Sequence, residues 1–116
     1  MADYLPKFHD GVAITLSASA AITGGQLVAV TGAGTVGPAG ADSTAVVGVA
    51  GFDVQNGDRV TVYRHGVQRL AADAAITAGA PVASAADGQV SASGSNHIGV
   101  ALTAASKKGD VIDVAM

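Results

Sequence analysis

Residues 20–29 read AAITGGQLVA, and residues 74–83 read AAITAGAPVA. Three further pairs of segments recur in the same order: 34–36 with 88–90, 47–50 with 98–101, and 57–62 with 109–114. All four pairs are separated by 51 to 54 residues. Chance similarity between stretches rich in Ala, Gly and Val would not keep four matches in one order. The chain therefore carries two copies of one unit, which is too few for a solenoid.

In each copy, alternating apolar and polar residues or short apolar runs predict four strands. The pairs are 12–16 and 67–70, 27–30 and 81–83, 45–50 and 97–102, and 59–64 and 111–115. The third pair is apolar nearly throughout, so we expect these two strands to be buried on both faces. Asn56-Gly57 and Lys108-Gly109 predict tight turns before the fourth strands.

A helix over residues 67–78 is the competing interpretation, because apolar residues recur there at helical spacing and alanine favours helix. The matching residues 13–24 are rich in Ser and Thr and make a poor helix. We therefore expect at most a short helical turn near Ala71 to Ala75. The predicted fold is all-β, a small barrel or sandwich built from two pseudo-repeated halves, each covering the other's apolar face, with little or no helix.

The predicted organisation is an N-terminal arm, residues 1–11, followed by a single β domain, residues 12–116. Within the domain, the first repeat covers about residues 12–65 and the second about residues 66–116.

The apolar residues are mostly small. The 116 residues include 25 Ala and 16 Gly, against two Phe, two Tyr and no Trp. Burial contributes roughly 25 cal/mol per Å² of apolar surface, while each ordered residue costs about 1–2 kcal/mol of backbone entropy. We expect a single copy to be marginally stable unless it buries further surface against copies of itself or a partner.

Charge and composition exclude several classes of function. The net charge is −3, and the six basic residues are scattered apart from Lys107 and Lys108, so we expect no nucleic-acid binding. No apolar run approaches the roughly 20 residues of a membrane span. The N-terminal sequence lacks signal-peptide features, so we expect synthesis in a cytoplasm. With no cysteine, disulfides, thiolate zinc sites and Cys nucleophiles are excluded.

One stretch imitates a dinucleotide-binding site. Residues 32–37 read GAGTVG after a predicted strand, and Asp53 follows about 20 residues later. That mechanism needs a helix whose N-terminal amides face the pyrophosphate. The following residues, 38–44, are too short and too broken for such a crossover. We assign the glycines to a hairpin loop.

The remaining polar residues do not indicate an active site. His9, His65 and His97 are far apart in sequence and lack metal-ligand spacing. We expect His97 to cap or pack at the head of a buried strand. Asp58 and Asp110 occupy equivalent turns, so they are turn residues rather than a catalytic pair. We expect no catalytic residue, no cofactor and no metal, and the protein not to be an enzyme.

The N-terminal arm contains half of the aromatic residues of the chain. Its candidate contact residues are Tyr4, Leu5, Pro6, Phe8 and His9. One interpretation is an arm folded back on the barrel. The other is an extended arm that docks on a partner, because Pro6 favours extended backbone and aromatic residues concentrate interface energy.

The sequence resembles phage cement, or capsid-decoration, proteins. The resemblance covers the chain from about Val12 onward and rests on residues 13–28, on VVGVAGFD at 46–53, and on IGVALT at 98–103 followed by Gly109-Asp110 and a last strand. It implies a structural protein on the exterior of a tailed-phage virion. Such proteins commonly form homotrimers that bridge neighbouring major capsid proteins, so the implied partners are the major capsid protein and further copies of the chain. The family motifs include no catalytic residue.

A different class of function stays open, a small β-clip-like module that binds a ligand or carbohydrate. Residues 75–82 resemble stretches of such domains. Carbohydrate sites usually present aromatic platforms, and this chain has only Tyr4, Phe8, Phe52 and Tyr63 to supply one.

Overall fold

The computed structural model describes residues 13–116, and strands dominate this part of the chain. The first half contains β1 (Ala13–Ala18), β2 (Leu27–Gly32), β3 (Thr35–Pro38), β4 (Val46–Ala50) and β5 (Arg59–Tyr63). The second half contains β6 (Val67–Ala71), β7 (Pro81–Ser84), β8 (Val90–Ser91), β9 (His97–Ala101) and β10 (Val111–Ala115), with one 3-10 turn, η1 (Ala86–Gly88). The all-β prediction with little helix is confirmed.

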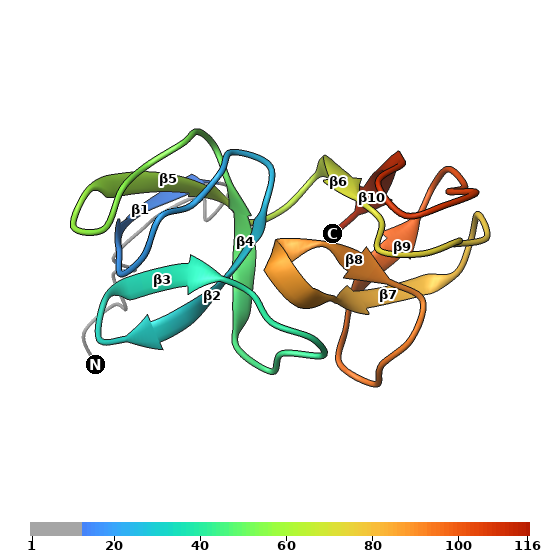
Figure 1. The fold of residues 1–116 in the computed structure, drawn as a ribbon, viewed down its shortest axis with the longest axis horizontal. Coiled ribbons are helices and arrows are strands. Elements are labelled where there is room, and N and C mark those ends of the chain that lie inside the picture. Colours follow the sequence, from blue (N-terminus) through green and yellow to red (C-terminus); the bar gives the residue numbers. More distant parts are fainter. Residues whose placement is uncertain (1–12) are drawn as a thin grey trace, which may run out of the picture.

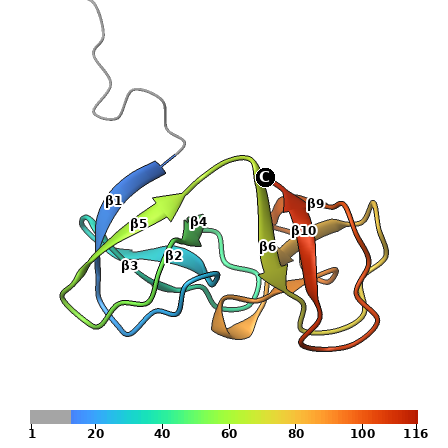
Figure 2. The same cartoon turned by 90° about the horizontal axis from the view of Figure 1, so that it is seen from above.

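The two halves have the same strand order. The first half closes into a barrel in the order β1-β3-β2-β4-β5, and the second forms a five-stranded sheet in the order β6-β10-β9-β7-β8. A parallel bridge between Ala72 and Val90 joins the two ends of that sheet. It repeats the parallel pair of Ala18 and Val36 in the barrel. The halves lie side by side along the long axis of the molecule (Figure 1, and from above in Figure 2).

All four predicted strand pairs are present, with ends shifted by one or two residues where the structure describes them. β3 and β8 were not predicted, because they have four and two residues and lie among Gly, Pro and Ser. Residues 71–75, where at most a short helical turn was expected, contain no helical turn. Ala71 ends β6, and the amide of Ala72 donates to the carbonyl of Asp110 at 2.8 Å. Tertiary hydrogen bonds there override the helical preference of alanine.

The repeat extends to the irregularities of the backbone. The pairing of β2 with β4 shifts register after Val28, and that of β7 with β9 shifts after Val82. In both halves the residue opposite the shift is glycine, Gly48 or Gly99. A Cβ atom on either glycine would overlap the carbonyl oxygen of the next strand, that of Tyr63 or of Ala115. Only glycine allows the strands to approach this closely at the bulge.

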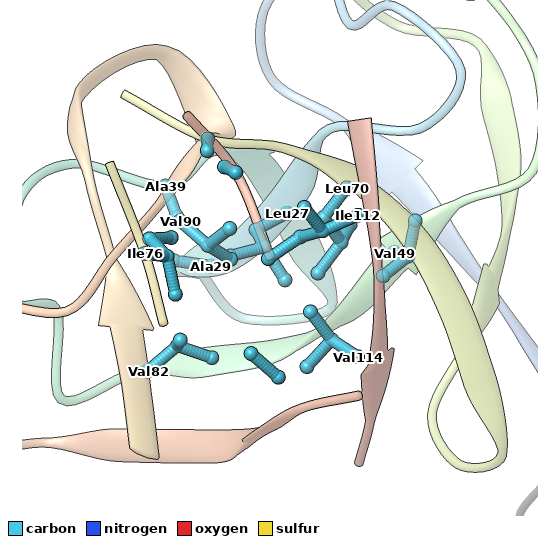
Figure 3. Packing of buried hydrophobic residues seen from close by; sticks show 13 residues of the cluster. Leu27, Ala29, Ala39, Val49, Leu70, Ile76, Val82, Val90, Ile112 and Val114 are labelled. Carbon is cyan, nitrogen blue, oxygen red and sulfur yellow. The ribbon is translucent and has the colours of Figure 1, made fainter. Parts of the chain in front are cut away.

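The buried residues form two clusters of unequal composition. One cluster fills the barrel and comes from the first half alone. The other fills the second half but also includes Leu27, Ala29, Ala39 and Val49 from the first half. In Figure 3, Leu27 lies beside Leu70 and Ile112 of the second half. The outward face of β2 and β4 is thus part of the core of the second half.

This one-sided packing corrects two expectations. The two halves were expected to cover each other's apolar faces, but only the first half contributes outward residues to the core of the second. The two third strands were expected to be equally buried. Val49 on β4 is 4% exposed, whereas its counterpart Val100 on β9 is 43% exposed. The second half covers the outward face of β4, and no described residue covers Val100 to the same extent.

Candidate functional site

The carboxylates of the two turn residues, Asp58 and Asp110, accept hydrogen bonds from their own loops. Oδ2 of Asp58 accepts a hydrogen bond from the backbone N–H of Gln55 at 3.0 Å. Oδ2 of Asp110 accepts bonds from the backbone N–H and the hydroxyl of Ser106, both at 2.9 Å. The backbone bond from Ser106, and next its hydroxyl, lower the pKa of Asp110. Asp58 and Asp110 are therefore turn residues, as the sequence predicted.

The glycine-rich segment forms a hairpin. β2 continues to Gly32, β3 begins at Thr35, and the two strands pair antiparallel. Gly34 lies in the turn with φ of +73°, where glycine is favoured. Because no helix follows β3, helix amides cannot bind a pyrophosphate at this segment.

Two histidines that are far apart in the sequence line the same groove. His65 and His97 line one shallow groove of about 280 Å³, together with Arg64 and Met116. His97 is exposed at the start of β9, which corrects the expectation that it heads a buried strand. Within residues 13–116, no three His, Cys, Asp or Glu side chains gather in a way that could hold a metal ion.

An open groove of about 400 Å³ lies where the two halves meet. Its polar lining includes Gln26, Arg69, Asp87 and Gln89. Nε2 of Gln26 donates to the carbonyl of Asp87 at 2.9 Å, so one lining side chain already links the two halves. The groove is a seam rather than an enclosed pocket.

A polar clamp fastens the loop after β3 to the second half. The hydroxyl of Ser84, which is 2% exposed, donates to the carbonyl of Gly40 at 2.8 Å and accepts from the N–H of Ser43 at 2.9 Å. Oδ1 of Asp42 accepts from the N–H groups of Asn96 and Ser95, at 2.9 and 3.0 Å. These backbone bonds, from Asn96 first and Ser95 second, hold the pKa of Asp42 below its ordinary value.

The lowered pKa of Asp42 predicts an acid-sensitive contribution to stability. The contribution is fully present above the ordinary aspartate pKa, about 3.9, and is lost as the pH falls through the depressed pKa of the folded state. Asp42→Asn keeps the shape and tolerates φ of +49° but removes the charge. We expect its urea midpoint to lie below that of the wild type at pH 7, and the difference between the two midpoints to be smaller at pH 3. A difference of equal size at both pH values would contradict the prediction.

The second half presents an apolar row on its outward face. Cross-strand pairing aligns Val67 with Ala115, Ala115 with Val100, and Val100 with Pro81, across β6, β10, β9 and β7. Val67 is 58% exposed, Val100 43%, and the adjacent Leu102 51%. We call these five residues, Val67, Pro81, Val100, Leu102 and Ala115, the apolar row. Exposed apolar residues that lie side by side on one face are common at interaction sites.

Comparison of the sequence with known protein families identifies a match. The sequence profile of phage cement proteins matches residues 7–116. The chain belongs to the phage cement protein family. It is thereby a capsid-associated structural protein, and the resemblance based on residues 13–28, 46–53 and 98–103 is confirmed. No curated protein matches the sequence of the chain.

A solved structure shows the same fold. The N base of the head fiber gp8.5 of bacteriophage phi29 superposes with a TM-score of 0.73 over 90% of this chain and 92% of that chain, at 21% sequence identity. At this level of identity, the likeness concerns the architecture of the two halves.

The candidate arm residues, Tyr4, Leu5, Pro6, Phe8 and His9, lie outside the described residues. The family match begins at residue 7, so it includes Phe8 and His9 but neither Tyr4, Leu5 nor Pro6. Among the elements from Ala13 onward, no helix is long and apolar enough to cross a membrane.

Proposed function

We propose that this chain decorates the exterior of a tailed-phage capsid as a homotrimer and stabilises the shell by bridging neighbouring major capsid proteins, without enzymatic activity. The observation that carries the proposal is the cement-family match over residues 7–116. The seam between the halves is an open groove, and the described residues hold no metal-binding cluster. Both features suit a protein that works through its surface.

The shape supports a bridging role. The molecule measures 49 × 35 × 21 Å, so it presents broad faces relative to its thickness. A plate of this kind can contact two shell subunits at once. When one contact has formed, the second forms at high effective concentration, so modest contacts become strong together. The net charge of −3 and the scattered basic residues suit a position away from the packaged DNA.

We assign part of the capsid contact to the arm. Tyr4, Leu5, Pro6, Phe8 and His9 combine aromatic residues with a proline that favours extended backbone. An extended segment can add to an exposed sheet edge of a capsid protein through backbone hydrogen bonds. On this proposal, the two halves supply the rigid body and the arm supplies an anchor.

Co-sedimentation with expanded, empty capsids of the same phage tests both assignments. We expect the full chain to pellet with capsids, and a variant lacking Met1 to His9 to remain folded by circular dichroism but to bind about tenfold more weakly or worse. Tyr4→Ala combined with Phe8→Ala should also weaken binding. Phe52→Ala, which removes a 49%-exposed aromatic ring elsewhere, is the matched control and should bind normally.

The outcomes separate the proposals. A full chain that stays in the supernatant would end the capsid proposal, and measurable glycan binding by that same protein would favour the carbohydrate-binding alternative. Undiminished pelleting of the deletion variant would remove only the role of the arm.

A further inference from the structure

The contact between the two halves is made by a different surface on each half. The second half contributes the turn between β7 and β8, at Asp87 and Gly88, and the first half contributes the start of β2, at Gln26 and Leu27. The carbonyl of Asp87 accepts the bond from Gln26. A Cβ atom on Gly88 would lie 2.7 Å from Cβ of Gln26 and 2.8 Å from the carbonyl oxygen of Leu27. The backbone of the turn is thus in direct contact with β2.

The repeat supplies a second copy of the turn, and no described residue covers that copy. Ala33 and Gly34, between β2 and β3, are the counterparts of Asp87 and Gly88. Gly34 has φ of +73° and Gly88 has φ of +68°, so the two glycines share a backbone conformation. A Cβ atom on Gly34 would meet no atom within 4 Å. The space that Gln26 and Leu27 occupy beside Gly88 is open beside Gly34.

The repeat also supplies a second copy of the surface that receives the turn. Ala80 and Pro81 are the counterparts of Gln26 and Leu27, and Val100 is the counterpart of Val49. Leu27 and Val49 are 0% and 4% exposed beneath the second half. Ala80 is half-buried against the core of the second half, whereas Pro81 is exposed and Val100 is 43% exposed. We call Ala80, Pro81 and Val100 the end surface, which overlaps the apolar row.

The two uncovered surfaces lie toward opposite ends of the molecule. In Figure 1, the β7–β8 turn points toward the first half, and the β2–β3 turn points in the same direction, away from the second half. The halves therefore follow one another head to tail. Each molecule ends in one unmatched turn and one unmatched end surface.

We propose that the end surface of one copy receives the Ala33–Gly34 turn of a second copy, so that the contact between the halves is repeated between molecules. The inference deepens the proposed self-association and rests on it. A head-to-tail contact is heterologous, and it closes into a ring when its rotation permits. A homotrimer built in this way would have three identical contacts and no free turn.

The contact between copies is weaker than the contact between halves. Ala80 lacks the amide with which Gln26 binds the carbonyl of Asp87. The loop between β8 and β9, the counterpart of the loop that contains Asp42, reads ASGSN at residues 92–96, so it has no carboxylate to make the bonds that Asp42 makes. We therefore expect assembly to depend on protein concentration, and to be favoured where the capsid holds copies close together.

Single-cysteine variants test the direction of the contact, because the natural chain has no cysteine. Ala33→Cys and Ala80→Cys are small changes at the counterparts of the contacting residues Asp87 and Gln26. With a short bismaleimide, we expect a covalent dimer when the two variants are mixed, and little when either is treated alone. The chain carrying both Gln26→Cys and Asp87→Cys is the positive control and should cross-link internally.

A substitution on the end surface gives an independent readout. Val100→Glu places a charge there, and sedimentation velocity should show self-association weakened about tenfold or more. Val111→Glu is the matched control, since Val111 is 64% exposed but lies in the seam between the halves. Val111→Glu should associate like the wild type.

Cross-linking both in solution and on capsids distinguishes a failure of the head-to-tail contact from a failure of the capsid proposal. Equal dimer formation by Ala80→Cys alone, or capsid-bound protein that never joins position 33 to position 80, would overturn the head-to-tail contact and leave the capsid proposal standing. Cross-linking at these positions by a protein that does not pellet with capsids would overturn the capsid proposal alone.

Discussion

Replacing Leu27 by alanine is expected to lower the free energy of unfolding by about 2–5 kcal/mol. Leu27 is 0% exposed and belongs to the core cluster of the second half, although β2 is a strand of the first. Alanine would leave a cavity beside Leu70 and Ile112 (Figure 3). Native domains have about 5–15 kcal/mol of stability, so this loss would be a large share of the total.

Urea unfolding followed by circular dichroism measures the effect. Leu102→Ala is the matched control, because the same side chain is removed from a position that is 51% exposed, and it should change stability by less than about 0.5 kcal/mol. If the two variants unfolded at the same urea concentration, Leu27 would not be part of the shared core.

Gly48→Ala is expected to cost about 3 kcal/mol or more, at the upper end of overpacking effects. Its Cβ atom would overlap the carbonyl oxygen of Tyr63 and lie 2.9 Å from Cγ1 of Val62. Backbone cannot move aside as the end of a flexible side chain can. β4 and β5 would have to separate where Val49 pairs with Tyr63 and Ala50 with Val62.

Gly99→Ala in the second half repeats the experiment, since its Cβ atom would overlap the carbonyl oxygen of Ala115. Gly40→Ala is the control, because a Cβ atom there meets nothing within 4 Å and its φ is not positive. We expect thermal unfolding to occur at clearly lower temperature for Gly48→Ala and Gly99→Ala, and near the wild-type temperature for Gly40→Ala. Wild-type melting of Gly48→Ala would show that the bulge can rearrange around a side chain.

Sequence reasoning found the features whose signals are local. Alternation placed β5 and β10, and Asn56-Gly57 and Lys108-Gly109 marked turns that the structure shows with φ near +90° at Gly57 and Gly109. It missed β3 and β8, which have only four and two residues and lie among Gly, Pro and Ser. It also did not place His65 and His97 along one groove, because that arrangement depends on how the two halves pack.

The sequence by itself determined the duplication, the all-β class and the resemblance to cement proteins, because repeated motifs and residue patterns are written along the chain. Only the tertiary structure decided that the halves are joined one-sidedly. Val49 and Val100 occupy matching positions in matching strands, yet one is buried and the other exposed. The difference arises because the second half packs on the outward face of β4, whereas no described residue packs in the same way on β9, and the local patterns of the two strands are too alike to record this.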